Sequence, residues 1–224
     1  MKKVVIPAGS PDRLTFFLAV EEYLAQSAKE DMFFTWQSPP TVICGRNQVI
    51  ENEVNLDYCR ENDIVVVRRK SGGGCVYSDR GNVMLSFVTP DLGVEEVFAR
   101  YLEMVAGVLR ELGFDAVTTE HNDILVGGRK VSGNACFATP RATIVHGTML
   151  YDLDFDALAR STTPSAEKLA KHGVQSVRQR VVNLKSLGLK LDAAGLRKYF
   201  EDRLCDSEMV LTAEDIEKIV KFEN

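Results

Sequence analysis

The sequence predicts a mixed α/β fold, and two patterns support that prediction. Apolar runs rich in β-branched and aromatic residues, such as 63–69 and 83–89, are typical of buried strands. Other segments repeat apolar residues every three or four positions, as a helix with one buried face does. The clearest of these helices covers 94–112 and closes at Gly113. The chain has 224 residues, of which 45% are hydrophobic and 26% charged, which excludes a disordered or fibrous protein.

The first part of the chain begins with a helix and continues with two strands. Residues 13–27 show helical spacing of apolar residues behind Asp12, which we expect to cap the helix. The apolar runs 33–37 and 41–45 follow, separated by a Pro-Pro pair, and we expect them to form paired strands.

The second part adds a strand over 143–151 and then becomes helical and polar. Helices are predicted over 192–204 and over 212–222, the latter capped by Thr212. We therefore expect a main domain over 1–185 and a short helical segment over 186–224 that packs on it.

Charge and cysteine content restrict the class of protein. The 27 basic and 32 acidic residues give a net charge of −5, which argues against a general nucleic-acid binder. No apolar run is long enough for a secretory signal or a membrane span. The five cysteines are odd in number and contain no C-x-x-C pair, so neither a disulfide framework nor a zinc knuckle is expected. These features predict a reduced cytoplasmic protein that does not bind membranes.

The stretch RRKSGGGCVYSDRGN (68–82) is the least ordinary part of the sequence. Glycine without a Cβ atom lets backbone N–H groups come close to a ligand and converge on an anion, and basic residues precede the glycines. Neither the P-loop pattern nor the dinucleotide fingerprint fits this stretch. Taken alone, it is more often a flexible turn with solvated basic neighbours.

A second unusual stretch, NDILVGGRKVSGNA (122–135), has the pattern of a hairpin that turns at Gly127 and Gly128. With that turn, Leu125 pairs with Lys130, Ile124 with Val131 and Asp123 with Ser132. Ile124, Val126 and Val131 then share the core face, while Asp123, Leu125, Lys130 and Ser132 share the other. Asp123 and Lys130 occupy diagonal positions roughly 7–8 Å apart.

The Asp123–Lys130 face could be an exposed, salt-bridged surface, which contributes little. Gly133 and its small neighbours instead indicate that something approaches this face closely. His146 lies in another strand, where a lone histidine is more often structural than catalytic. The three histidines have no metal-ligand spacing, and no metal ligand is predicted.

Taken together and in order, these segments resemble the lipoate–protein ligase A family, within the superfamily of biotin and lipoate protein ligases. The matching segments are EEYLA (21–25), VICGRNQ (42–48), RRKSGGGCVYSDRGN (68–82), LSFV (85–88), HNDILVGGRKVSGNA (121–135), HGTMLYDLDFDALA (146–159) and GVQSVRQRVVNL (173–184). The resemblance implies a catalytic domain of largely antiparallel β-sheets flanked by helices.

The resemblance also implies an activity. The carboxylate of lipoate attacks the α-phosphate of ATP, and the resulting lipoyl-AMP transfers its acyl group to a lysine of a lipoyl carrier domain. The carrier would belong to a 2-oxoacid dehydrogenase complex or be the glycine cleavage H protein. ATP and Mg²⁺ are the implied cofactors, with the metal offsetting pyrophosphate charge.

The implied site residues follow from the matching motifs. Lys130 bridges the acyl carbonyl and the α-phosphate, where negative charge builds up. The implied nucleotide-binding residues are Arg69, Gly73, Gly74, Cys75, Val76, Tyr77, Asn122, Asp123, Lys130 and Ser132. The implied lipoate contacts are Lys130, Arg69, His146 and Trp36, with Val42 to Cys44 as further candidates for the apolar tunnel.

Two alternatives stay open beside ATP-dependent ligation. One is transfer of a lipoyl or octanoyl group from an activated donor. Cys136 is best interpreted as a small buried residue, which disfavours a thioester mechanism. The other is a non-catalytic module that holds lipoate. Single-chain relatives usually continue into an accessory domain beyond the position of Asn224, so a separately supplied accessory domain is a candidate partner.

Overall fold

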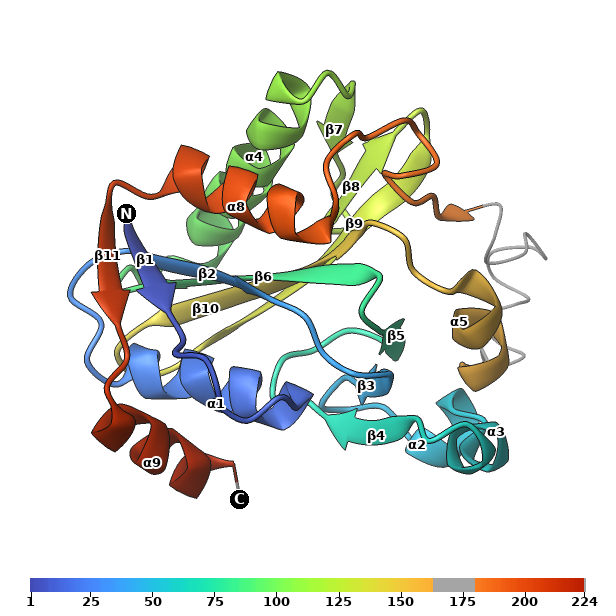
Figure 1. Cartoon of the computed structure of the whole chain (residues 1–224), viewed down its shortest axis with the longest axis horizontal. Helices are drawn as coiled ribbons and strands as arrows, with labels where there is room; N and C mark the ends of the chain where they lie inside the picture. The colour runs from blue at the N-terminus through green and yellow to red at the C-terminus, as the bar shows by residue number, and fades with distance from the viewer. Residues whose placement is uncertain (163–179, 224) are drawn as a thin grey trace.

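A computed structural model describes residues 1–162 and 180–223 (Figure 1). Residues 173–179 of the family-like segment 173–184, and His172, lie outside the described residues. The larger sheet has the strand order β11-β1-β2-β6-β10-β9-β8-β7, and the smaller has the order β4-β3-β5. The strands are β1 Lys2–Val5, β2 Met32–Trp36, β3 Thr41–Cys44, β4 Val65–Arg68, β5 Val76–Ser78, β6 Asn82–Thr89, β7 Ala116–Thr118, β8 Asp123–Val126, β9 Arg129–Ala138, β10 Thr143–Leu150 and β11 Ser207–Val210.

Helices cover both faces of the larger sheet (Figure 1). The described helices are α1 Leu14–Ala25, α2 Ile50–Glu53, α3 Leu56–Glu61, α4 Val94–Glu111, α5 Phe155–Ser161, α8 Ala193–Leu204 and α9 Ala213–Phe222. In Figure 1, α4 and α8 lie above the sheet and α1 and α9 below it. Adjacent strand residues therefore enter different cores: Phe33 packs with the α4 side and Phe34 with the α1 side. None of the described helices is long and apolar enough to cross a membrane.

The pairing confirms a largely antiparallel arrangement. Strands β2, β6, β10, β9, β8 and β7 pair antiparallel along the larger sheet, and only the pairs of β1 with β2 and with β11 are parallel. The predicted strands 83–89 and 143–151 are β6 and β10, in the middle of this sheet. The predicted helix 94–112 is α4, and Gly113 follows it with a φ of 89°.

Three predictions about the first part of the chain are wrong. The runs 33–37 and 41–45 do not pair, because β2 belongs to the larger sheet and β3 to the smaller one. Proline has no N–H to donate to a strand partner, and the proline pair lies outside both strands, where the chain crosses from the larger sheet to the smaller one. The run 63–69 is not a buried strand, because β4 lies at the edge of the small sheet and Val65 is 56% exposed.

The third error concerns the cap of α1. Arg13, not Asp12, occupies the N-cap position, and it makes no side-chain cap hydrogen bond. The carboxylate of Asp12 instead pairs with Arg80. The Thr212 cap of α9 is confirmed, as a full capping box with Asp215.

The segment from 186 onward contains more than the predicted helices. Strand β11 lies between α8 and α9 and pairs in parallel with β1, at the edge of the larger sheet. This segment also contributes the buried residues Leu196, Phe200, Leu211 and Ile219 to the two main cores.

Candidate active site

The hairpin that carries Lys130 (the lysine hairpin, 122–135) turns where predicted, but the pairing of its strands differs from the prediction farther from the turn. Gly127 and Gly128 have φ values of 57° and 72°, which the tight turn requires, and Leu125 pairs with Lys130. A β-bulge between Ile124 and Leu125 then shifts the register, so that Ile124 faces Ser132 and Asp123 faces Gly133. The predicted pairs Ile124–Val131 and Asp123–Ser132 are therefore wrong, because a single extra residue displaces the pairing by one.

The bulge brings Lys130 and Asp123 together across Gly133. The Lys130 Nζ atom lies 2.7 Å from Asp123 Oδ1, with both side chains about a third exposed or less. A Cβ atom on Gly133 would lie only 2.6 Å from Cε and Nζ of Lys130. What approaches Gly133 closely is thus the Lys130 side chain, which needs the missing Cβ to reach Asp123.

Arg69 is buried at the end of β4 and holds the glycine-rich stretch. Its Nη2 atom donates to the carbonyls of Gly72 at 2.7 Å and Gly74 at 2.9 Å, and Nη1 donates to the carbonyl of Ile43 at 3.0 Å. The Nε atom donates to Ser71 Oγ at 3.0 Å. The loop therefore winds around the guanidinium.

No carboxylate pairs with Arg69 among the described residues, and burial lowers the pKa of its guanidinium. Neutral carbonyls and a hydroxyl solvate the cation, and one Nη1 hydrogen has no hydrogen-bond acceptor in the described part of the chain. Such a buried cation is a natural partner for an anionic ligand.

Gly45 allows the loop to return close to β3. A Cβ atom on Gly45 would lie 2.0 Å from the carbonyl oxygen of Gly73, which is backbone and cannot move aside cheaply. Gly73 itself has a φ of 92°. Glycine at both positions is thus required by close approach and by left-handed backbone geometry.

The hairpin and the glycine-rich loop line one cavity of about 240 Å³. Predicted site residues that line it are Arg69, Gly73, Gly74, Val76, Asn122, Asp123, Lys130 and His146. Leu18, Ile43, Val76 and Met84 supply an apolar part of the lining, and Asp123 is its only carboxylate among the described residues. A cavity with cations at one part and aliphatic side chains at another suits a molecule with an anionic head and an apolar tail.

Four predicted residues do not line this cavity. Tyr77 is 4% exposed and packs in a core between the small sheet and α5, and Cys75 packs against the same core. Ser132 is fully buried by the bulge, and its hydroxyl donates to Asn134. Trp36 is also buried; it stacks on Phe17 and lines a different pocket. The apolar candidate Ile43 does line the cavity, whereas Val42 and Cys44 face the core.

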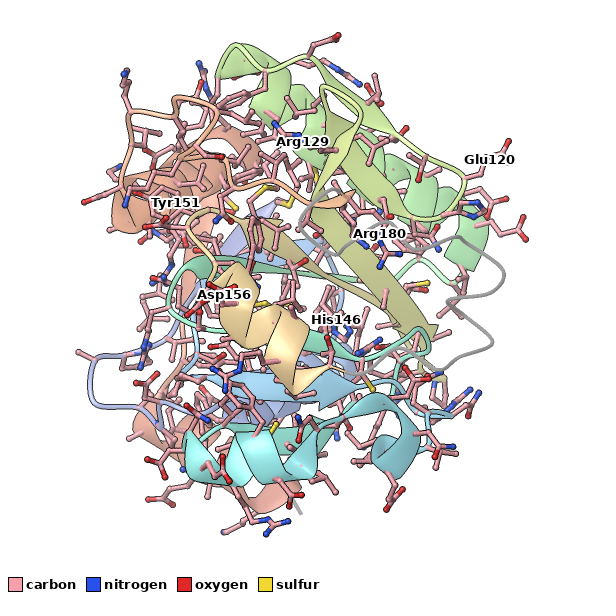
Figure 2. All side chains as sticks on the ribbon, turned by 90° about the vertical axis from the view of Figure 1, so that its right-hand side faces the viewer. Glu120, Arg129, His146, Tyr151, Asp156 and Arg180 are labelled. Atoms are coloured by element: carbon pink, nitrogen blue, oxygen red, sulfur yellow. The ribbon has the colours of Figure 1, made fainter. Side chains whose placement is uncertain are left out.

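Unpredicted residues also line the cavity, among them Leu18, Met84 and His121. Two further buried residues, which contact His146, were not predicted either. Glu21 on α1 is 1% exposed, and Ser71 in the loop is fully buried. The His146 ring lies between them, with Nδ1 2.8 Å from Glu21 Oε2 and Nε2 2.7 Å from Ser71 Oγ. His146 is 6% exposed; in the view of Figure 2 it lies near the middle of the molecule, and Arg129 is labelled above it on the β8–β9 hairpin. A signal for Glu21 existed in the sequence, because it follows Phe17 by four residues and so belongs to the apolar face of the helix.

Comparisons with known proteins show what this chain is similar to. A family model described as the lipoyl protein ligase A/B catalytic domain matches residues 14–204. Lipoate-protein ligase LplJ of Bacillus subtilis is 39% identical over 170 residues, which cover 75% of this chain and 51% of that protein. Lipoate–protein ligase 1 of Staphylococcus aureus is 36% identical over 218 residues, which cover 94% of this chain and 66% of that protein.

Solved structures show the same fold. A bipartite lipoate protein ligase from Thermoplasma acidophilum, studied with its E2 lipoyl domain, has a TM-score of 0.84 at 27% identity, covering 99% of this chain and 91% of that one. A lipoate-protein ligase A bound with ATP has a TM-score of 0.84 at 26% identity, covering 99% and 94%. This chain spans between half and two thirds of the length of the two curated relatives. The chain belongs to the lipoyl protein ligase A/B catalytic domain family.

Proposed function

We propose that this protein is an ATP-dependent lipoate–protein ligase. The observation that supports it most directly is the meeting of Arg69 and Lys130 in one cavity that also has an aliphatic lining. The carboxylate of lipoate would lie at the cationic part and its carbon chain against Leu18, Ile43, Val76 and Met84. The relatives named as lipoate ligases, and the related structure bound with ATP, support the same substrates.

In the first step, a lipoate carboxylate oxygen attacks the α-phosphorus of ATP, and the bond from that phosphorus to pyrophosphate breaks. Lys130 offsets the negative charge that develops on the α-phosphate and acyl oxygens. Its ion pair with Asp123 is partly exposed and therefore weak, so an incoming phosphate can compete for the ammonium group.

In the second step, the neutral amine of a carrier lysine attacks the acyl carbon of lipoyl-AMP. The bond from that carbon to AMP breaks, the amine loses a proton and the amide forms. We propose a lipoyl carrier domain as the acceptor, of a 2-oxoacid dehydrogenase complex or the glycine cleavage H protein. The Thermoplasma lipoate protein ligase, which was studied together with its E2 lipoyl domain, supports this choice.

Mg²⁺ is part of the proposal as the ion that accompanies the nucleotide phosphates. In the described residues, no group of three His, Cys, Asp or Glu side chains could hold a metal ion. Mg²⁺ is commonly held by one or two carboxylates together with substrate phosphates, and Asp123 is a carboxylate that lines the cavity. When bound, the ion would supply positive charge to the departing pyrophosphate.

The transferase alternative has little support from the cysteines. Burial raises the pKa of the Cys136 thiol, and burial beside Cys44 raises the pKa of Cys75 to about 12. A thiol that stays protonated near neutral pH is a poor nucleophile for a thioester intermediate. The choice between the two enzyme hypotheses then depends on whether ATP is consumed.

Pyrophosphate release tests the proposed function. The full chain is mixed with lipoate, ATP and Mg²⁺, with and without an apo lipoyl domain and a separately supplied accessory domain. Lys130→Ala should slow adenylation about 100-fold or more, the usual loss of one charge-stabilising group. Lys185→Ala is the matched control, because that exposed lysine also forms an ion pair with an aspartate, Asp152, and is not among the residues that line the cavity. No pyrophosphate under any of these conditions, or full activity of Lys130→Ala, would contradict the proposal.

A further inference from the structure

A buried chain of hydrogen bonds connects Arg69 to Glu21 on α1. Arg69 Nε donates to Ser71 Oγ at 3.0 Å, Ser71 Oγ lies 2.7 Å from His146 Nε2, and His146 Nδ1 lies 2.8 Å from Glu21 Oε2. We call these four residues the relay. All four are less than 10% exposed, so the hydrogen bonds that join them are largely shielded from water.

The relay fixes the position of its own hydrogens. The guanidinium can only donate, so Ser71 Oγ accepts from Arg69. The Ser71 hydroxyl hydrogen must then go to His146 Nε2, since no other acceptor for it exists among the described residues. With Nε2 as that acceptor, the ring would carry a hydrogen on Nδ1 and donate it to Glu21.

The relay reaches one carboxylate oxygen of Glu21, and a second arm of hydrogen bonds reaches the other oxygen. Trp36 Nε1 donates to Ser86 Oγ at 2.8 Å, and Ser86 Oγ donates to Glu21 Oε1 at 2.5 Å. In both arms, the last group therefore donates a hydrogen bond to the Glu21 carboxylate. An amide at position 21 has one acceptor oxygen and an NH₂ donor, so it cannot accept from both arms.

We propose that Glu21 is a positioning residue for Arg69. By accepting from both arms, it favours the Nδ1–H tautomer of His146, in which Nε2 accepts the Ser71 hydroxyl hydrogen while Ser71 Oγ accepts from the Nε atom of Arg69. The orientation of Arg69 in turn sets the glycine-rich loop, through the carbonyls of Gly72 and Gly74. The step from Arg69 to catalysis rests on the proposed function, whereas the tautomer does not.

The neighbouring residue on α1 provides a matched control. Glu22 also reaches the glycine-rich stretch, through an ion pair of 2.5 Å with Lys70, whose side chain is 66% exposed. Glu22→Gln makes the same chemical change one residue away and leaves the relay intact. It therefore separates the relay from a general loss of negative charge on α1.

The first experiment measures the tautomer in the ligand-free, full-length protein. Nitrogen-15 spectra of the imidazole rings should show His146 protonated at Nδ1 and unprotonated at Nε2. The His146 signals are identified by comparison with the variants His121→Gln and His172→Gln. A ring protonated at Nε2, or at both nitrogens, would overturn the relay, whatever reaction the protein catalyses.

The second experiment measures formation of lipoyl-AMP. Glu21→Gln should lower kcat/KM at least 10-fold, because a small displacement of a substrate-contacting group costs up to about 100-fold. Glu22→Gln should stay within about twofold of the wild-type protein. Ser71→Ala breaks the same link with a smaller change and should show the same loss if Glu21→Gln does not fold. A folded Glu21→Gln protein, or a folded Ser71→Ala protein, with full activity overturns the positioning role.

The two proposals fail in different ways. If the wild-type protein released no pyrophosphate, the proposed function would fail while the Nδ1–H tautomer of His146 could still be observed. If pyrophosphate release were normal but the tautomer were wrong, only the relay would fail.

Discussion

At the scale of single residues, Gly133 determines where the amine of Lys130 lies. The Lys130 side chain crosses the position that a Cβ atom on Gly133 would fill, and there it reaches Asp123. The atoms that a Cβ atom would meet belong to the flexible end of the Lys130 side chain. Gly133→Ala would therefore displace the amine without disrupting the sheet. The cost should therefore appear in catalysis before it appears in stability.

We expect Gly133→Ala to lower kcat/KM for adenylation by about 100-fold while its melting temperature stays near that of the wild-type protein. Gly107→Ala is the control, since a Cβ atom there meets nothing within 4 Å in the middle of α4. It should leave activity unchanged and stabilise the protein by about 1 kcal/mol. Full activity of Gly133→Ala would show that its missing Cβ does not position Lys130.

Arg69 is a buried cation that holds the glycine-rich loop and also lines the cavity. Its side chain organises the loop through backbone carbonyls, and its charge has no carboxylate partner among the described residues. A lysine at this position would keep the charge but lose the planar set of donors that the loop surrounds.

At the scale of elements, the capping box of α9 joins that helix to α1. The Asp215 side chain accepts from the Thr212 backbone N–H at 2.8 Å and from the hydroxyl of Tyr23 on α1 at 2.5 Å. The Tyr23 hydrogen bond, followed by those of Thr212, lowers the pKa of Asp215 below its ordinary 3.8. A carboxyl with a lowered pKa stabilises the fold above its ordinary value, and the effect is lost as the pH falls through the folded value.

We expect Asp215→Asn to reduce the free energy of unfolding by about 1 kcal/mol at pH 7, the usual contribution of a helix cap. The difference from the wild-type protein should shrink below about pH 4, as Asp215 becomes protonated. Denaturant unfolding across pH measures this. Asp202→Asn, which changes an exposed carboxylate paired with Lys198, should cost only a few tenths of a kcal/mol. A difference independent of pH would contradict this role of Asp215.

At the scale of the whole molecule, the segment after 186 is part of the main fold. Strand β11 extends the sheet that holds the lysine hairpin, and Ile219 of α9 is fully buried in the same core as α1. Helix α1 contributes Glu21 to the site. Because α9 packs in the same core as α1, it helps to hold α1 in position.

Neighbouring residues on α9 test this integration. Ile219→Ala should cost about 2–5 kcal/mol of unfolding free energy, because it leaves a cavity in a closed core. Val220→Ala, at a side chain that is 37% exposed, should change it by no more than about 0.5 kcal/mol. Equal costs for the two variants would mean that α9 is not packed as an integral part of the core.

The parts of the site predicted from sequence are those that depend on local chain geometry. The Gly127–Gly128 turn fixes the hairpin, and a basic strand end before three glycines marks a loop suited to an anion. The bulge was not predictable from the apolar pattern, because Ile124, Val126 and Val131 are predicted to face the core without it and are buried with it.

The sequence by itself determined the mixed α/β class, the helix α4, the hairpin and its lysine, since turns and periodic burial are set by neighbours along the chain. Only the tertiary structure decided that β2 and β3 belong to separate sheets and that Trp36 and Tyr77 face away from the cavity. It also brought Glu21, Ser71 and His146 together, from segments as far apart as 125 positions. The physical reason is that such pairings depend on which faces of distant elements are buried against each other, and this is settled only when the cores form.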